Sequence, residues 1–133
     1  MENLFTYGTL MCAQIMEAVS GCRLPRTPAK LGGYRRRGVT GQWYPAIVPR
    51  AGECVEGVVY RNVPPPAWRS VDTYEGQMYR RERVKVRSLD GESLVAWTYV
   101  FRPEYRRYLS RSDWSYPAFL RNAKAAYLET LRR

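Results

Sequence analysis

The stretch LFTYGTLM, residues 4–11, decides how the chain begins to fold, because a run of strand-forming side chains stops at a glycine and a helix pattern follows. Leu4 to Tyr7 are aromatic, aliphatic or β-branched and predict a strand, and Gly8 lets the chain turn where a side chain would block it. A strand that enters a helix through a glycine turn leaves backbone N–H groups unpaired, and these can bind an anion. The turn is therefore a candidate binding site, although its local sequence fits a plain connection equally well.

Beyond this turn, helix and strand patterns alternate, and glycines interrupt the strand patterns between residues 31 and 60. Such interruptions are typical of a barrel-like or strongly bent sheet. The expected helices cover residues 12–20, ended by Gly21, residues 65–75, ended by Gly76 as a left-handed cap, and residues 117–131, which should cover one side of the sheet. The expected strands cover residues 4–7, 31–37, 45–48, 55–60, 79–87 and 93–100, with an extended connection over residues 22–30.

The length and composition predict one folded domain over residues 1–133. Hydrophobic residues make up 45% of the chain and aromatic residues 14%, which is typical of a globular protein. No apolar run is long enough to cross a bilayer, and the N-terminus lacks the pattern of a signal peptide. We therefore expect a cytoplasmic protein without a membrane partner.

The side chains present limit the chemistry. The sequence contains no histidine, which excludes Ser-His-Asp and Cys-His catalysis and leaves a carboxylate as the expected base of an enzyme. The cysteines at positions 12, 22 and 54 have the spacing of neither a disulfide framework nor a zinc site. We expect three free thiols and no metal.

The chain is strongly basic, with a formal charge of +10 and 19 arginines against 3 lysines. Arginine clusters at residues 35–37, 80–81 and 106–107 each have a tyrosine close by, which would suit stacking and phosphate contacts in a nucleic-acid-binding protein. The clusters are scattered, however, and no RNA-binding signature is present. We favour solvated surfaces and do not expect a nucleic-acid partner.

Residues 68–75 place a carboxylate on the apolar face of a helix. Trp68, Val71, Asp72 and Glu75 follow one another at i, i+3, i+4 and i+7 and share a face. Desolvation and the negative end of the helix dipole would both raise the pKa of Glu75 toward neutrality and make it a usable base. A solvated Glu75 is the open alternative. Asp72 could pair with Glu75 as a two-carboxylate site, but at this spacing we favour a local hydrogen bond from Asp72 to a backbone group.

Five stretches together resemble the γ-glutamylcyclotransferase-like family, especially its small bacterial and plant members. They are LFTYGTLM at 4–11, GYRRRGVTGQWYPAIVP at 33–49, VEGVVY at 55–60, VDTYEGQMYRRERVKV at 71–86 and DGESLVAWTYV at 90–100. The combination of YGTL with the later motif D-x-[YF]-E-G-x-x-Y-x-R carries the resemblance, which spans residues 4 to about 100.

The resemblance implies an α+β fold, a small mixed β-barrel flanked by helices. It also implies a cofactor-independent enzyme that converts a small-molecule γ-glutamyl amine or amino acid to 5-oxoproline and a free amine. The turn Tyr7, Gly8, Thr9 and Leu10 would hold the substrate through backbone amides, and Glu75 would be the catalytic acid–base. After YGTL the chain departs from better characterised members and starts a helix directly, so the leaving amine stays open.

Other matching positions are weaker candidates. Tyr44, Tyr79 and Arg81 match family positions and are expected either to line the pocket or to have a structural role. Arg36 could attract an anionic substrate, but we favour a solvated side chain. The alternative functions are a non-catalytic relative that binds a small carboxylate or a partner and, as a weaker alternative, a basic nucleic-acid-binding module.

The oligomeric state is expected to be a monomer or a homodimer. Trp114 and Tyr116 would favour the dimer if they were exposed.

Overall fold

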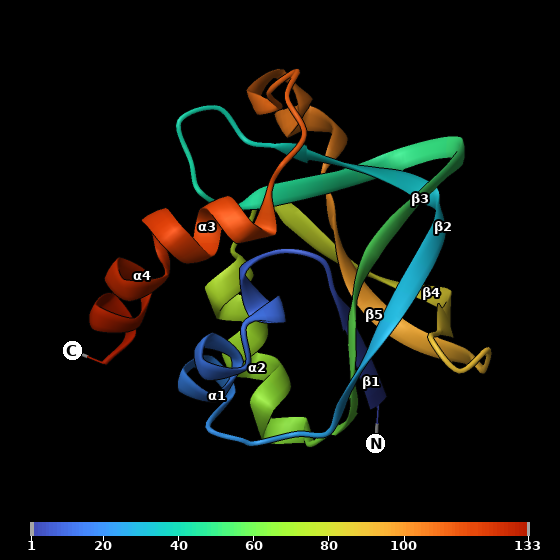
Figure 1. Cartoon of the computed structure of the whole chain (residues 1–133), viewed down its shortest axis with the longest axis vertical. Helices are drawn as coiled ribbons and strands as arrows, with labels where there is room; N and C mark the ends of the chain where they lie inside the picture. Colours follow the sequence, from blue (N-terminus) through green and yellow to red (C-terminus); the bar gives the residue numbers. More distant parts are fainter. Residues whose placement is uncertain (1, 133) are drawn as a thin grey trace.

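The computed structural model describes residues 2–132, in which five strands close into a barrel in the order β1-β3-β2-β4-β5 (Figure 1). Strand β1 pairs antiparallel with β3 and parallel with β5, where Leu4 lies opposite Trp97, and this last pairing closes the barrel. The predicted α+β barrel is confirmed. The strands are β1 Glu2–Thr6, β2 Arg26–Gly38, β3 Pro45–Val63, β4 Tyr79–Ser88 and β5 Ser93–Phe101. The helices are α1 Ala13–Ser20, α2 Pro65–Glu75, α3 Tyr116–Asn122 and α4 Lys124–Leu131, with short 3₁₀ helices η1 Thr9–Met11 and η2 Pro103–Tyr108.

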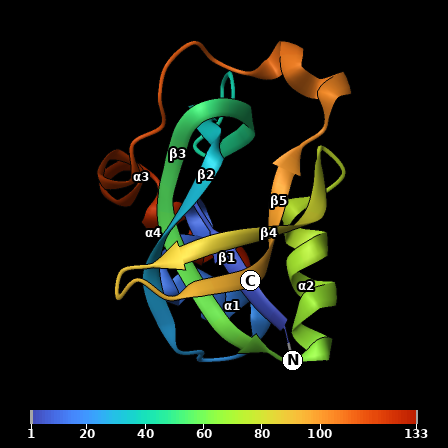
Figure 2. The ribbon, with the colours of Figure 1, turned by 90° about the vertical axis from the view of Figure 1, so that its right-hand side faces the viewer.

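Strands β2 and β3 are longer than the sequence predicts. Residues 26–30, expected in a connection, already pair with β3, and the two short strands expected at 45–48 and 55–60 are one continuous strand. Glycine causes the difference: the register shifts between Gly32 and Tyr34, and Gly33 has a φ of 85°. Glycine here bends a strand instead of ending it. Figure 2 shows β2 and β3 curving together over the barrel.

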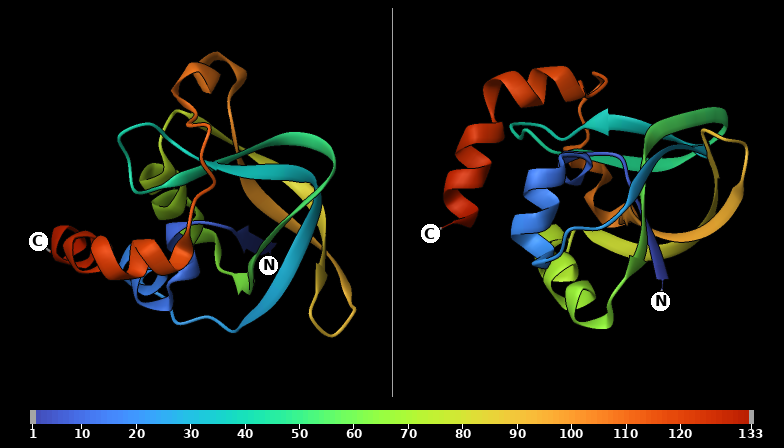
Figure 3. Two further views of the ribbon diagram at one scale, coloured as in Figure 1. Left: turned by 45° about the horizontal axis from the view of Figure 1, so that its top comes forward. Right: turned by 60° about the horizontal axis from the view of Figure 1, so that its bottom comes forward.

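The apolar side chains form two cores, one inside the barrel and one between the barrel and the helices. Strand β1 contributes side chains to both cores, because Phe5 points into the barrel and Leu4 points toward the helices. In both views of Figure 3 the helices α1 to α4 keep to one side of the barrel. Alternation across β1 therefore fixes which face of the barrel the helices cover, and this explains its uninterrupted hydrophobic sequence.

The helices agree with the sequence in part. Helix α1 ends at Gly21, whose φ of 76° is left-handed, and α2 has the predicted bounds. Gly76 has a positive φ of 84° but a ψ of −174°, so it is not the predicted left-handed cap. Across residues 2–132, the structure contains no helix with the length and apolar character that a membrane crossing requires.

The single helix predicted over residues 117–131 is wrong. The chain leaves helical geometry at Ala123, with a φ of −134°, and α4 starts in a new direction. Phe119, Ala123 and Leu128 are all buried, so the break lets both segments pack apolar side chains against the core. Trp114 is also buried and Tyr116 partly so, which removes the exposed aromatic pair expected to favour a dimer.

Candidate active site

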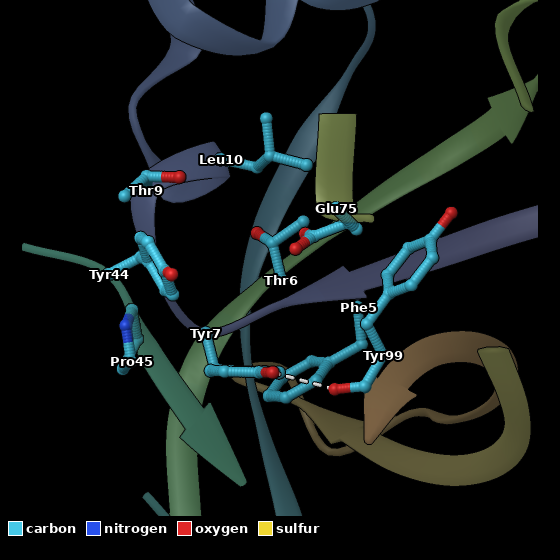
Figure 4. A pocket seen from close by; sticks show the side chains of 10 residues that line it. Phe5, Thr6, Tyr7, Thr9, Leu10, Tyr44, Pro45, Glu75 and Tyr99 are labelled. Carbon is cyan, nitrogen blue, oxygen red and sulfur yellow. Dashed lines mark hydrogen bonds between the residues drawn. The ribbon is translucent and has the colours of Figure 1, made fainter. Parts of the chain in front are cut away.

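A narrow hollow lies where β1 ends, next to the C-terminal end of α2. Its walls are Phe5, Thr6, Tyr7, Gly8, Thr9, Leu10, Tyr44, Pro45, Glu75 and Tyr99. Figure 4 shows the carboxylate of Glu75 directed into this space, with Tyr44 and Pro45 on another wall. The structure thus brings together the two sequence features singled out above, the glycine turn and the carboxylate of α2.

The turn at residues 7–10 is fixed through its carbonyl oxygens. The amides of Met11 and Cys12 donate to the oxygens of Gly8 and Thr9 at 3.0 and 3.2 Å. The Tyr60 hydroxyl donates to the oxygen of Leu10 at 2.7 Å. By contrast, the amides of Gly8, Thr9 and Leu10 have no protein acceptor within residues 2–132. Because residues 8–10 line the hollow, these amides are available to donate to a bound carboxylate or oxyanion.

Arg36 is a structural residue that the sequence did not reveal. Its Nη1 donates to the carbonyl oxygens of Tyr7 at 2.8 Å and Glu56 at 3.1 Å, and its guanidinium lies 5.3 Å from the centre of the Trp114 ring. The side chain is partly buried, so the predicted solvated arginine is wrong. A charge-assisted hydrogen bond to Tyr7 holds the start of the turn in place.

Glu75 ends α2 and is partly buried at the edge of the hollow. Loss of hydration raises the pKa of its carboxyl group to about 8, and the nearby negative charge of Asp72 adds to the shift. Trp68 and Val71, which share its helix face, are buried as the sequence pattern predicts. A carboxylate with a pKa near 8 can both accept and return a proton at physiological pH.

Asp72 joins α2 to the barrel through its side chain. Its carboxylate accepts a hydrogen bond from the Tyr99 hydroxyl at 2.6 Å and lies 3.7 Å from Arg81. Burial and Asp72 raise the pKa of Tyr99, which keeps this hydroxyl protonated as the donor. The predicted local backbone hydrogen bond for Asp72 is therefore wrong, and the contact with Tyr99 joins α2 to β5.

Of the three weaker candidates, one lines the hollow and the other two make structural contacts outside it. Tyr44 lines the hollow. Tyr79 is buried and its hydroxyl donates to the carbonyl oxygen of Pro45 at 2.7 Å, which holds that wall. Arg81 lies over the rings of Trp68 and Trp97 at 4.7 and 5.3 Å, outside the hollow.

Tyr7 contributes its backbone to the turn, while its ring enters the barrel. Its hydroxyl donates to the carbonyl oxygen of Tyr99 at 2.6 Å (Figure 4). Thr6 and Tyr99 also line the hollow and were not predicted, because they are separated along the sequence and meet only when β1 pairs with β5. Within residues 2–132, no three cysteine, aspartate or glutamate side chains are grouped to hold a metal ion.

The structure is a five-stranded barrel with a hollow in which unpaired backbone amides and a desolvated carboxylate lie together. Such a site is suited to acid–base chemistry. The chain belongs to the family described as gamma-glutamyl cyclotransferase, AIG2-like, whose model matches residues 4–116. It is 33% identical over 104 residues to the Arabidopsis thaliana AIG2-like protein D. The matched region covers 76% of this chain and 68% of that protein.

Solved structures share the fold. A solution structure of another Arabidopsis thaliana protein superposes with a TM-score of 0.72 at 26% identity, covering 98% of this chain and 79% of the other. A structure described as gamma-glutamyl cyclotransferase gives a TM-score of 0.68 at 18% identity, over 98% of this chain and 86% of the other. The family resemblance drawn from the sequence is confirmed.

Gly8→Ala is expected to damage the turn. A Cβ at residue 8 would lie 2.8 Å from both Cγ and Cδ of Pro45, so Pro45 or the turn would have to move. Such overpacking typically costs about 1–3 kcal/mol. We expect a comparable loss of stability in urea unfolding, together with a loss of about tenfold or more in any activity of the site, because displaced amides no longer point correctly.

The matched control is Gly38→Ala, whose Cβ would meet its nearest atoms at an ordinary 3.7 Å. It should change stability by less than about 0.5 kcal/mol. Equal effects of the two substitutions would contradict the role of the close approach between Gly8 and Pro45.

Proposed function

We propose that this protein is a γ-glutamylcyclotransferase, which releases 5-oxoproline and a free amine from a small γ-glutamyl compound. One observation carries the proposal: Glu75, with a raised pKa, lines the same hollow as the unpaired amides of residues 8–10. Membership of the family supports the reaction class.

In the proposed reaction, the substrate's α-amine attacks its own γ-carbonyl carbon. The new C–N bond closes a five-membered ring, and the bond from that carbon to the leaving nitrogen then breaks. Glu75 takes one proton from the α-ammonium group before the attack and a second from the same nitrogen after the new bond has formed, and it passes both to the leaving nitrogen, which departs as an ammonium group. No proton is gained or lost overall. Nucleophile and electrophile belong to one molecule, and the site therefore only has to hold the substrate in a ring-forming pose.

The backbone amides of Gly8, Thr9 and Leu10 would stabilise negative charge in this reaction. They can hold the substrate carboxylate or the tetrahedral oxyanion, and the hydrogen bonds that the carbonyl oxygens of residues 8–10 accept keep the turn in place before the substrate arrives. Thr9 adds a link to α2, since its hydroxyl and that of Tyr74 are 2.7 Å apart. This contact ties the turn to the helix that carries Glu75.

The direct test is release of 5-oxoproline, measured by mass spectrometry, from a panel of γ-glutamyl amino acids, γ-glutamyl-ε-lysine and glutathione. Release from at least one compound supports the proposal and identifies the leaving amine. Saturable binding of these compounds without release would instead favour a non-catalytic relative that binds a small carboxylate.

The activity is expected to depend on pH through Glu75. The base is active when deprotonated, and its pKa is raised to about 8. On the acid side of that value, kcat/KM should therefore rise about tenfold per pH unit and level off near pH 8. A profile that is flat between about pH 5.5 and 7.5, as expected for an ordinary carboxylate, would rule out Glu75 as the titrating base.

Asp72→Asn tests whether the charge of Asp72 contributes to the raised pKa of Glu75. It removes the negative charge that contributes to the raised pKa of Glu75, so the inflexion should move to lower pH. An unchanged inflexion would show that the charge of Asp72 does not contribute to the shift.

A further inference from the structure

A second hollow opens on the other side of Glu75. It has a volume of about 750 Å³, measured out to solvent, and it shares Tyr44 and Glu75 with the first hollow. Its remaining walls come from the loop between β2 and β3, from the residues that follow Glu75, and from η2. A substrate held at the turn of residues 7–10 could therefore extend past Glu75 into this second space.

Half of the residues that line the second hollow are aromatic or apolar, and two glutamines and a threonine add neutral polar groups. Tyr44, Tyr105 and Tyr108 line it, together with Val39 and Met78. The rings of Tyr105 and Tyr108 are stacked, with centres 6.2 Å apart and planes inclined by 29°. A flat or large apolar group would meet several ring faces at once, which is favourable for aromatic packing.

These walls are held in position by the backbone. The amide of Thr40 donates to the carbonyl oxygen of Tyr108 at 2.7 Å, and Val39 forms an isolated β-bridge with Leu109. The loop after β2 and the helix η2 are thereby joined into one wall. A hollow that is already formed needs little ordering when it binds a ligand, which favours selectivity.

A cationic group would find only one charged partner in this hollow. Among the described residues that line it, Glu75 alone is charged, and the others are neutral. A second ammonium group would pair only with the carboxylate that must exchange protons with the reacting nitrogens. A neutral side chain leaves Glu75 free for that task.

We propose that this hollow binds the leaving amine and selects γ-glutamyl compounds whose amine carries an aromatic or large apolar group. The inference rests on the proposed function, because Glu75 returns its proton to the leaving nitrogen and that nitrogen must lie between the two hollows. Tyr108 is the residue that tests it: its side chain is 40% exposed, so its removal leaves no cavity in the core.

The experiment compares kcat/KM for γ-glutamylphenylalanine, γ-glutamylglycine and γ-glutamyl-ε-lysine, followed by 5-oxoproline release. The wild type should prefer the phenylalanine compound by about tenfold or more over each of the others, as expected for an apolar pocket. Tyr108→Ala should reduce that preference to about threefold or less. Trp43→Ala is the matched control: Trp43 is a similarly exposed aromatic residue, 46% accessible, on the loop between β2 and β3 but outside this hollow, and its removal should preserve the preference.

Two results separate this inference from the proposed function. Release of 5-oxoproline without preference, or with preference for the lysine compound, overturns the inference and leaves the cyclotransferase proposal intact. Preference that survives Tyr108→Ala also overturns it. Absence of release from every compound overturns both proposals.

Discussion

Replacing Glu75 with glutamine is expected to reduce 5-oxoproline release by about 10²–10⁴-fold, the usual contribution of a positioned acid–base group. Glutamine has nearly the same shape and can still fill its place in the hollow, but it cannot accept the proton of the α-ammonium group. The loss should appear in kcat, because the amides of residues 8–10 can still bind the substrate. The measurement is the steady-state rate on the best substrate of the panel.

The stability of the same variant shows whether lost activity reflects lost structure. The pKa of Glu75 rises from an ordinary 4.5 to about 8 on folding, so between these values the folded protein binds more protons than the unfolded chain. Wild-type stability should therefore decrease as pH rises through this window. The glutamine variant does not titrate, and near pH 8.5 it should be about 2 kcal/mol more stable than wild type, after allowance for partial exposure.

The control substitution is Glu17→Gln on α1, whose carboxylate pairs with exposed Arg23 at 2.8 Å. It should leave both activity and the pH dependence of stability unchanged. Activity of Glu75→Gln within about threefold of wild type would remove Glu75 from the mechanism. If Glu75→Gln is less stable than wild type at high pH, the conclusion that the carboxylate of Glu75 is desolvated would be wrong.

The helix that carries Glu75 could be predicted from the sequence because its determinants are local. Prolines at residues 64–66 mark its start, Trp68 and Val71 define its buried face, and Gly76 ends it. The glycine turn at residue 8 is equally local. Both halves of the candidate site are visible as short patterns, and the family resemblance adds the expectation that they face each other.

The supporting contacts could not be predicted because they join residues far apart in the sequence. Arg36 reaches Tyr7, and Tyr79 reaches Pro45, only after the barrel has closed. Nothing in a run of three arginines shows that the middle one is held by two backbone carbonyls. The break at Ala123 has the same origin, since the periodicity of residues 117–131 suits one helix and the core decides otherwise.

Gly57→Ala is expected to have the largest effect on folding. Gly57 lies in β3 beside β1, and a Cβ there would be 2.1 Å from the carbonyl oxygen of Thr6 and 2.9 Å from Cζ of Phe5. The first contact is with backbone, so no side-chain rotation can relieve it. We expect a loss of about 3 kcal/mol or more in urea unfolding, or failure to fold, because the pairing that places β1 in the barrel must open.

Gly32→Ala is the matched control for this substitution, because Gly32 lies in the neighbouring strand β2 and an added Cβ would meet no atom within 4 Å. It should change stability by less than about 0.5 kcal/mol. If Gly57→Ala folds, its activity should still fall more than that of Gly32→Ala, since β1 leads directly into the turn at residues 7–10 and any shift of Thr6 moves the amides. Wild-type stability and activity in Gly57→Ala would show that the close approach of β3 to β1 does not position the site.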